Sequence, residues 1–178
     1  MRAYFLRSRR LGFSTWTQAD WPLAFELWGN PEVTTLTGGP FTPEQVRQRL
    51  AREIINQAEH GVQYWPIFLE ETGEHVGCCG LQPRKPAEAS YELGFQLRVA
   101  FWGRGFAREA GEAVIAHAFT ALDVRALFAG HHPDNQASRS VLTRLGFHYT
   151  HDEFYPPTGQ IEPCYLLRRG ALPESLAP

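Results

Sequence analysis

The sequence of 178 residues has few cysteines, no long apolar run and almost no excess of charge of either sign. No stretch approaches the ~20 apolar residues of a transmembrane helix, so we expect no membrane partner. The net charge of −2 argues against a general nucleic-acid or membrane-surface binder. The first residues, MRAYFLRSRRLGF, contain no apolar segment of signal-peptide length.

Three cysteines cannot pair completely, and Cys78 and Cys79 are neighbours in a run that reads as a buried strand. Unpaired thiols fit a reducing compartment, so we expect the protein in the cytoplasm. No cysteine and histidine spacing matches a zinc site. The close histidine pairs at 131–132 and 148–151 are of a kind that is usually structural, so we expect no metal.

The composition is otherwise that of an ordinary globular protein, with 43 % hydrophobic and 20 % charged residues. A chain of this length is most simply one domain, residues 1–178, with a sizeable core. The many aromatic residues are expected mainly in that core, and some of them in a ligand pocket.

The first third of the chain carries clear helix-start signals. Thr17 can cap a helix, with Asp20 three residues on. Trp21, Phe25 and Trp28 then follow the helical period and predict one apolar face.

The next elements predict a second helix and a hairpin. Thr42-Pro-Glu-Gln45 is a capping box with proline at the first helical position, and the helical period continues to His60. The β-like runs Gln63–Leu69 and His75–Leu81 are separated by a short turn, which predicts an antiparallel hairpin. An earlier strand is expected at Leu11–Trp16.

In the second half, strands and helices alternate, which indicates an α/β domain. The expected elements are a loop at Gln82–Ala89, a strand at Tyr91–Val99, a helix at Ala107–Ala121, a strand at Ala126–Gly130, a helix from Asn135 to Leu145, and strands at Phe147–Thr150 and Pro163–Arg169.

The stretch from Tyr91 to Ala121 reads as a strand, a turn with two glycines and a helix. Gly103 and Gly105 allow backbone conformations that a Cβ resists. The N-terminus of the helix directs free N–H groups at this turn, which predicts a phosphate site. A dinucleotide fingerprint is the rival interpretation, but Arg108 stands where its third glycine belongs.

The segment Trp102-Gly-Arg-Gly-Phe-Ala107 resembles the acetyl-CoA loop of the GNAT acetyltransferases, whose motif is Gln/Arg-x-x-Gly-x-Gly/Ala. Tryptophan at its first position is typical of the branch similar to ribosomal-protein N-terminal acetyltransferases, the RimJ/RimL-like branch. The stretch Asn135-x-x-Ser138-x-x-Val-Leu142, followed by Leu145-Gly-Phe147, is similar to the later motif of the family. The resemblance covers essentially the whole chain.

The resemblance implies an α/β (α+β) GNAT fold, with a mixed, mostly antiparallel twisted sheet of six to seven strands and helices on both faces. It also implies that the parallel strands Tyr91–Val99 and Ala126–Gly130 splay apart and admit acetyl-CoA, with no metal. The implied coenzyme-binding residues are Leu97 and Val99 on the strand, Gly103, Arg104, Gly105, Phe106, Ala107 and Arg108 at the turn, and Asn135 and Ser138 on the later motif.

The reaction implied is direct attack of a primary amine on the thioester within a ternary complex. Ser138 is the candidate donor of a proton to the leaving thiolate, because Leu142 stands where some relatives have a tyrosine. Glu92 is the candidate base, since a carboxylate on an apolar strand is either paired or functional. His131, His132 or a water chain are alternatives.

The acceptor amine is not fixed by the sequence. A protein N-terminus, which the resemblance favours, competes with a small-molecule amine, and a homodimer is common in similar proteins. We expect the acceptor near the two N-terminal helices and the loop Phe154–Gln160, with Trp28, Phe41, Tyr64 and Tyr155 as candidate walls. A non-catalytic acyl-CoA-binding module is the alternative function.

Overall fold

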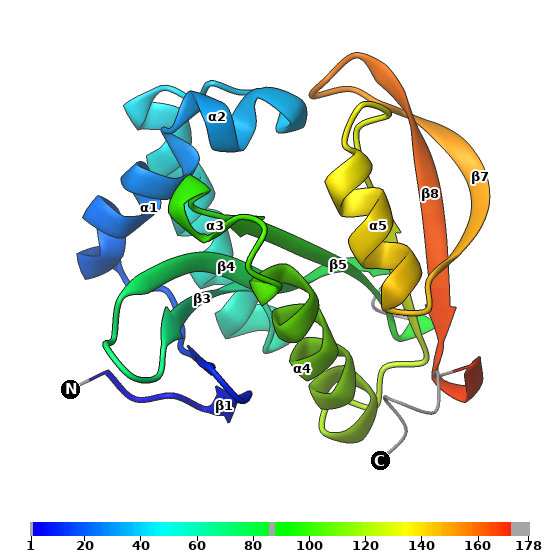
Figure 1. Cartoon of the computed structure of the whole chain (residues 1–178), viewed down its shortest axis with the longest axis horizontal. Helices are drawn as coiled ribbons and strands as arrows, with labels where there is room; N and C mark the ends of the chain where they lie inside the picture. The colour runs from blue at the N-terminus through cyan, green and yellow to red at the C-terminus, as the bar shows by residue number, and fades with distance from the viewer. Residues whose placement is uncertain (1, 86–87, 172–178) are drawn as a thin grey trace.

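A computed structural model describes residues 2–85 and 88–171, which form one eight-stranded sheet in the order β1-β2-β3-β4-β5-β6-β8-β7 (Figure 1). The strands are β1 (Leu6–Arg7), β2 (Leu11–Phe13), β3 (Tyr64–Leu69), β4 (His75–Lys85), β5 (Ser90–Leu97), β6 (Ala126–Gly130), β7 (His148–Tyr155) and β8 (Gln160–Arg168). The helices are α1 (Trp21–Trp28), α2 (Pro31–Thr34), α3 (Pro43–His60), α4 (Phe106–Thr120) and α5 (Gln136–Arg144).

The sheet is mixed and mostly antiparallel, as expected. Its one parallel pair within the described residues is β5 with β6, and every other neighbouring pair is antiparallel. The expected six to seven strands become eight because the chain before Leu11 folds back as β1. The strand expected at Leu11–Trp16 is also shorter, ending at Phe13.

The helix-start signals in the sequence are confirmed. Thr42 accepts a hydrogen bond from the N–H of Gln45, whose side chain accepts one from the N–H of Thr42, and α3 ends at Gly61 in the left-handed conformation. Thr17 and Asp20 form the second capping box, which opens a short 3₁₀ turn ahead of α1.

The apolar face predicted for α1 is confirmed at Trp28 and in part at Trp21, which packs against the core, but it is wrong at Phe25. Ala24, Leu27 and Trp28 are buried, whereas Phe25 is 39 % exposed and stacks on Trp21 at the surface. The period placed the three large aromatics together, but the small Ala24 allows the helix to approach the sheet on the neighbouring face.

The loop predicted at Gln82–Ala89 is partly wrong, because Gln82–Lys85 continue β4 and pair with Ser90–Glu92. Residues 86 and 87 lie outside the described part. Proline 83 is tolerated because odd-numbered residues of β4 direct their N–H groups toward β3, as the bond from Leu81 to Gln63 shows. The pairing with β3 ends at Gly80, so the N–H that proline lacks has no partner to lose.

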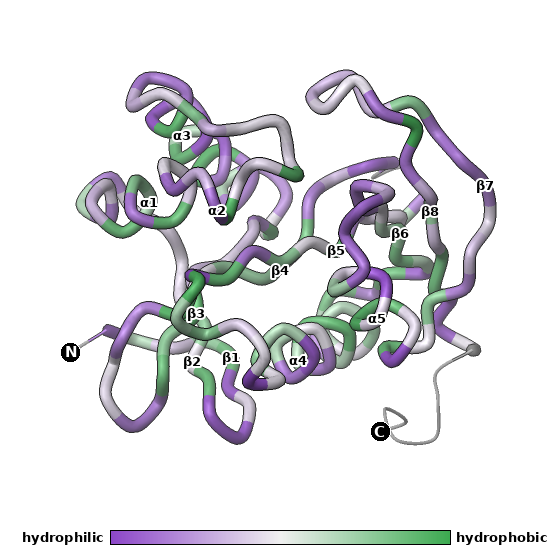
Figure 2. Tube along the Cα trace, turned by 45° about the horizontal axis from the view of Figure 1, so that its top comes forward, coloured by the Kyte–Doolittle hydropathy of each residue, from purple (hydrophilic) through white to green (hydrophobic). Residues whose placement is uncertain are grey.

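Helices cover both faces of the sheet (Figure 1). α4 and α5 contribute to the larger core, with Val114, Ile115 and Leu142 against apolar residues of the strands. α1 and α3 bury Leu27, Trp28 and Leu50 against the other face. β7, at the far edge, is exposed throughout and hydrophilic along most of its length (Figure 2). Within the described residues no helix combines the length and apolarity needed to cross a membrane.

Candidate active site

The glycine turn between β5 and α4 has the backbone that the sequence predicts. Gly103 and Gly105 adopt φ values of +70° and +78°, and Gly105 is the N-cap residue of α4. A Cβ at Gly103 would meet no atom within 4 Å, so the turn is open on that side. The free N–H groups of the first helical turn, which begins at Phe106, therefore face an accessible surface.

A cavity of about 360 Å³ with a charged lining adjoins this turn, and it joins the predicted Gly105 and Arg108 to residues that were not predicted. Its lining residues are Arg9, Arg10, Gly105, Arg108, Glu109 and Glu112. Arg10 comes from the β1–β2 turn and donates to the carbonyl of Arg104 at 3.2 Å and to the carboxylate of Glu109 at 2.6 Å. The sequence shows the basic pair Arg9-Arg10 before Leu11, but its position beside α4 depends on the fold and could not be predicted.

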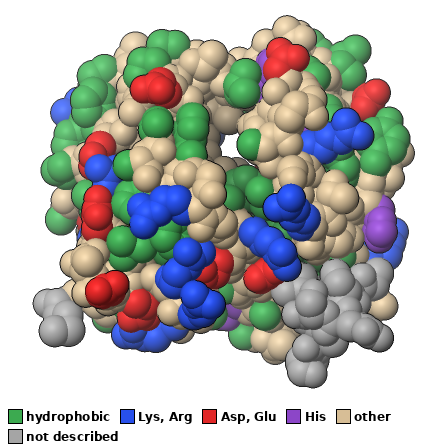
Figure 3. Space-filling model, in the orientation of Figure 1, with side chains coloured by type: hydrophobic (Ala, Val, Ile, Leu, Met, Phe, Trp, Pro, Cys, Tyr) green, Lys and Arg blue, Asp and Glu red, His purple; other side chains and the backbone are tan. Residues whose placement is uncertain are grey.

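The two arginines of the turn are arranged differently from each other. Arg104 lies beside the rings of Phe101 and Phe106, at 5.4 and 5.1 Å from their centres. Arg108 pairs with Glu112 one helical turn later, at 2.8 Å. Figure 3 shows Lys and Arg side chains gathered on the face that carries α4 and α5.

The parallel strands β5 and β6 separate as expected. Their pairing covers Ser90–Glu92 and ends at Glu92 opposite Phe128. Arg98 donates its N–H to Val76 on β4, so even-numbered residues of β5 face β4 and odd-numbered residues face β6. The backbone groups of Phe95 and Leu97 therefore face the gap that opens beyond the last pair.

The strand itself is shorter than predicted, because β5 ends at Leu97 and Val99–Phe101 form a 3₁₀ turn. Val99 is thus not a strand residue, and its carbonyl accepts the N–H of Trp102. The indole of Trp102 donates to the carbonyl of Leu97 at 2.8 Å. The β5 backbone groups that face the gap therefore include the N–H of Leu97 and both groups of Phe95.

Glu92 shares one face of β5 with Gly94 and Gln96, as strand alternation predicts. Its carboxylate accepts a hydrogen bond of 3.2 Å from the phenol of Tyr64 on β3. Burial raises the pKa of the Glu92 carboxyl, while the Tyr64 hydrogen bond and the charge of Arg84 lower it. The net direction is upward, which makes Glu92 a better proton acceptor when ionised.

A buried polar network surrounds Glu92 on this face and was not predicted. Glu53 of α3 is 1 % exposed and accepts hydrogen bonds from the N–H of Tyr64 at 2.8 Å and from Gln82 at 3.0 Å. Gln96 accepts from the indole of Trp28 at 3.0 Å and from Arg49 at 2.8 Å. The helical period of α3 places Glu53 and Arg49 on its inward face, where a charged residue needs a partner. This position could have predicted a buried polar network.

The later motif places Asn135 and Ser138 at the start of α5. Asn135 is the N-cap, since its side-chain oxygen accepts the N–H of Ser138 at 3.0 Å. The Ser138 side chain is partly exposed. α5 packs beside α4, so Ser138 lies on the sheet face opposite to the one that carries Glu92.

The two histidines considered as bases are held by local contacts. His131 is 5 % exposed, with its Nδ1 at 2.8 Å from the carbonyl of His132 and its Nε2 at 3.3 Å from the hydroxyl of Tyr165. His132 accepts the N–H of Asp134 at 3.2 Å. Within the described residues, no hydrogen bond or ion pair joins either histidine to Glu92 or Ser138.

Figure 3 shows an opening between the N-terminal helices and the β7–β8 hairpin. A Cβ at Gly38 would lie 2.6 Å from the carbonyl oxygen of Pro157, so the loop after α2 touches the tip of this hairpin. Of the expected walls, Trp28 and Tyr64 are buried in packing, whereas Tyr155 is 42 % exposed.

Comparisons with known proteins agree with this geometry. The profile of the acetyltransferase (GNAT) domain matches residues 10–148. N-acetyltransferase p20 of Bacillus licheniformis is 29 % identical over 144 residues, which cover 80 % of this chain and 81 % of that protein. An acetyltransferase crystal structure from Agrobacterium tumefaciens is 28 % identical, with a TM-score of 0.79 over 94 % of this chain and 98 % of that one.

A RimL ribosomal alpha-N-protein acetyltransferase, solved in complex with coenzyme A, has the same fold. Its TM-score is 0.78 at 19 % identity, over 90 % of this chain and 95 % of that one.

Proposed function

Because the chain belongs to the GNAT acetyltransferase family, we propose that it transfers an acetyl group from acetyl-CoA to a primary amine, by direct attack within a ternary complex. Family membership makes the protein an acetyl-CoA-dependent acetyltransferase; the amine acceptor and the residue roles are the proposal. The acceptor is a protein N-terminus, as in RimJ/RimL-like enzymes, or a small-molecule amine.

The observation that carries the proposal is the end of β5–β6 pairing at Glu92 and Phe128. Beyond this point the N–H of Leu97 and the backbone groups of Phe95 lack a strand partner within the described sheet. Such groups can bind an extended amide chain as if it were another strand. The pantetheine arm of acetyl-CoA is a chain of this kind.

The glycine turn at the mouth of the gap fits the pyrophosphate. Left-handed Gly103 and Gly105 turn successive N–H groups outward at the start of α4, where the helix dipole favours negative charge. Arg108 adds a guanidinium at the same place, and Phe106 and Ala107 provide N–H groups of the first helical turn. On the other side of the gap, the NH₂ group of Asn135 can donate to the arm, since only its oxygen is used by the cap.

The chemistry requires a free amine, a stabilised oxyanion and a proton for the leaving thiolate. Glu92, directly or through water, accepts the proton of the amine as nitrogen attacks the thioester carbon. A backbone N–H of β5 that faces the gap holds the oxyanion of the tetrahedral intermediate. When the carbon–sulfur bond breaks, the hydroxyl of Ser138 donates a proton to the thiolate.

The acceptor enters on the sheet face that carries Glu92, near the contact between the loop after α2 and the tip of the β7–β8 hairpin. That side places the amine and the coenzyme on opposite sides of the gap, as direct transfer requires. The three buried thiols, Cys78, Cys79 and Cys164, support a reducing compartment as the place of action. A homodimer remains part of the proposal.

The test is release of free coenzyme A thiol from acetyl-CoA over a panel of amines, polyamines and N-terminal peptides. Turnover with a primary amine, and none with the same compound acetylated, supports the proposal. Tight coenzyme A binding with no turnover on any acceptor would overturn it in favour of a binding module. The acceptor with the highest kcat/KM then defines the substrate class.

A further inference from the structure

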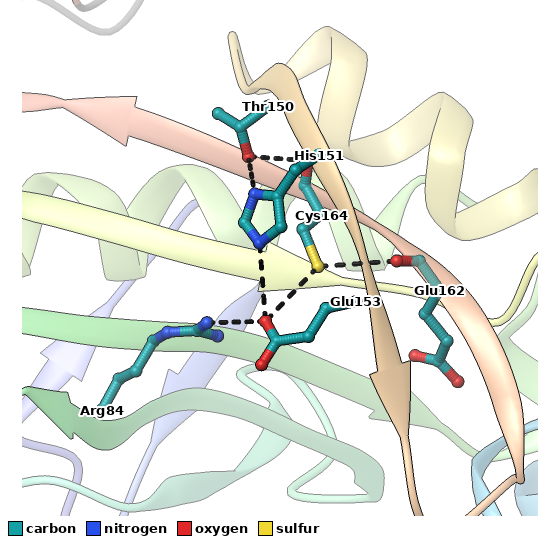
Figure 4. Close-up of polar contacts among 6 residues, drawn as sticks. All are labelled: Arg84, Thr150, His151, Glu153, Glu162 and Cys164. Carbon is teal, nitrogen blue, oxygen red and sulfur yellow. Dashed lines mark hydrogen bonds and ion pairs between the residues drawn. The ribbon is translucent and has the colours of Figure 1, made fainter.

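The β7–β8 hairpin carries a cluster of three side chains whose atoms suit a metal ion. His151 and Glu153 on β7 and Cys164 on β8 bring one ligand atom each to within 4.8 Å of one another. Figure 4 shows the Glu153 carboxylate between the imidazole and the sulfur. His151 and Glu153 are exposed and Cys164 is buried, so the cluster is anchored at one end and open to solvent at the other.

Two of the three separations are close to those of a tetrahedral zinc site. The Nε2 atom of His151 is 3.6 Å from the Glu153 carboxylate, and the sulfur of Cys164 is 3.9 Å from the same carboxylate. Nitrogen, oxygen and sulfur ligands of one Zn²⁺ lie about 3.3 to 3.6 Å apart at tetrahedral angles. Movements of a few tenths of an ångström would bring these two distances to the tetrahedral values, and the imidazole nitrogen and the sulfur, which lie within 4.8 Å of each other, would approach as the metal binds.

A β-bulge produces this arrangement. The register between β7 and β8 shifts between Tyr149 and His151, so that Thr150 is the extra residue and His151 lies directly opposite Cys164. A bulge of this kind re-aims the side chains that follow it. Glu153, two residues on, then falls on the same face of the strand as His151.

Thr150 fixes which imidazole nitrogen is free. Its hydroxyl donates to the carbonyl of Cys164 at 3.1 Å, so its single proton is used there. The Nδ1 atom of His151, 2.9 Å from the same hydroxyl oxygen, must then be the donor in that contact. A neutral ring then directs the Nε2 lone pair toward the Glu153 carboxylate, where a bound cation fits between the two, whereas a protonated ring forms an ion pair with that carboxylate at 3.6 Å. This second contact to Nδ1 is typical of a metal-binding histidine.

We propose that His151, Glu153 and Cys164 bind one Zn²⁺ ion, with the fourth position open to water or a ligand. This proposal departs from the sequence-based expectation of no metal, which treats His151 only as the partner of His148. The proposed ligands follow the spacing His-x-Glu and a distant cysteine rather than a paired Cys/His pattern. Glu153 also accepts a hydrogen bond of 2.9 Å from Arg84. A carboxylate has lone pairs enough to keep this contact while binding the metal, and Arg84 then orients it.

The alternative role for this cluster is a reactive thiol activated by histidine. Burial and the neighbouring Glu153 carboxylate raise the pKa of Cys164 to about 11, the opposite of what a nucleophilic cysteine needs. Zinc binding instead displaces the thiol proton and places the thiolate beside a divalent cation. The chemistry of the donor set therefore favours zinc over redox or acyl-transfer chemistry at Cys164.

The test uses tag-free protein, titrated with Co²⁺ as a spectroscopic probe and with Zn²⁺ against a chromophoric chelator. The expected result is one equivalent bound, with tetrahedral cobalt bands and a thiolate charge-transfer band that Zn²⁺ abolishes. Cys164→Ser should remove the charge-transfer band, and His151→Gln and Glu153→Gln should each weaken Zn²⁺ binding at least tenfold. His148→Gln, on the same exposed strand, is the matched control and should bind as the parent does.

Thr150→Val tests the positioning role separately, because it leaves all three ligands in place. The expected loss is about tenfold in Zn²⁺ affinity with the cobalt bands retained. No charge-transfer band in the parent protein, or equal affinity in Cys164→Ser and the parent, would overturn the site. Circular dichroism of each variant shows that its fold is intact, and none of these measurements depends on acetyl transfer.

Discussion

The phenol of Tyr64 donates a hydrogen bond of 3.2 Å to the carboxylate of Glu92, across two strands that are not neighbours in the sheet. The contact passes over Gly94, where a Cβ would lie 2.4 Å or a little more from the Tyr64 ring and is therefore excluded. The glycine thus makes room for the one hydrogen bond that stabilises the ionised form of the candidate base.

Removing this hydrogen bond should change the pH dependence of the reaction. The bond lowers the pKa of Glu92 against the larger effect of burial, so Tyr64→Phe raises that pKa further. Because activity needs ionised Glu92, the acidic limb of the pH profile should move to higher pH. The expected shift is about 0.5 to 1 pH unit for a hydrogen bond of ordinary strength. The measurement is the acidic limb of kcat/KM against pH. Tyr165→Phe, whose hydroxyl contacts His131, is the control and should leave the limb in place.

Glu92→Gln should lower kcat by about 10² to 10⁴ with little change in coenzyme A affinity. A role confined to packing would leave kcat near that of the parent, because Gln keeps the volume and can still accept from Tyr64. If kcat changes less than threefold with the best acceptor, Glu92 is not the base, and a water chain or another residue takes that role.

Glu92→Gln should also change how the free energy of unfolding depends on pH. A carboxyl whose pKa is raised in the folded state binds more protons when folded than when unfolded. Stability therefore falls as pH rises from the ordinary carboxyl pKa of 4.5 through the raised value. Glu92→Gln should lack this part of the decline in urea unfolding series at different pH.

Local signals in the sequence were sufficient for most elements of the fold. The capping boxes at Thr17 and Thr42 and the glycine stop after α3 depend on neighbouring residues, and each was found where expected. The errors came from non-local effects. Gln82–Ala89 read as a loop because of its two prolines and mixed charges, but Pro83 is acceptable in a strand because β3 has already ended beside it.

The residues of the candidate site likewise include some that local sequence predicts and some that only the tertiary fold brings together. The left-handed glycines at 103 and 105 and the cap at Asn135 are local and were predictable. Arg10 was not, since its place beside Gly105 depends on the pairing of β1 with β2 and on the packing of α4. The cluster of His151, Glu153 and Cys164 depends on the bulge at Thr150, and no residue type in that stretch predicts a bulge.

Ser138→Ala separates a proton donor from a cap partner. The cap uses the backbone N–H of Ser138, which alanine keeps, so stability should change by less than about 0.5 kcal/mol. If the hydroxyl protonates the thiolate, kcat should fall about tenfold to a hundredfold. Ser140→Ala, on the exposed face of α5, is the matched control and should leave kcat unchanged. A parent-like kcat in Ser138→Ala would assign that proton to water.

Arg108→Gln should weaken coenzyme A binding about tenfold, because it removes a guanidinium from the cavity beside the glycine turn. Its partner Glu112 then lies there without a counter-charge, which adds to the loss. Arg47→Gln, which removes an arginine stacked on Trp21 far from the turn, is the control. Calorimetry with coenzyme A and with dephospho-coenzyme A identifies the group involved. An equal loss for both ligands indicates the pyrophosphate, and equal affinity in variant and parent contradicts any phosphate contact.

Gly105→Val should abolish coenzyme A binding while the fold persists. A β-branched residue is strained at φ +78° by about 1 to 3 kcal/mol, so the turn relaxes and its N–H groups lose their alignment. The protein can tolerate the side chain sterically, since a Cβ there would meet only the end of Arg10, at 3.7 Å. Gly61→Val imposes a similar strain at φ +69° after α3, away from the turn, and controls for lost stability. Because both variants carry the same strain, loss of affinity in Gly105→Val alone assigns the pyrophosphate to this turn, and unchanged affinity removes that assignment.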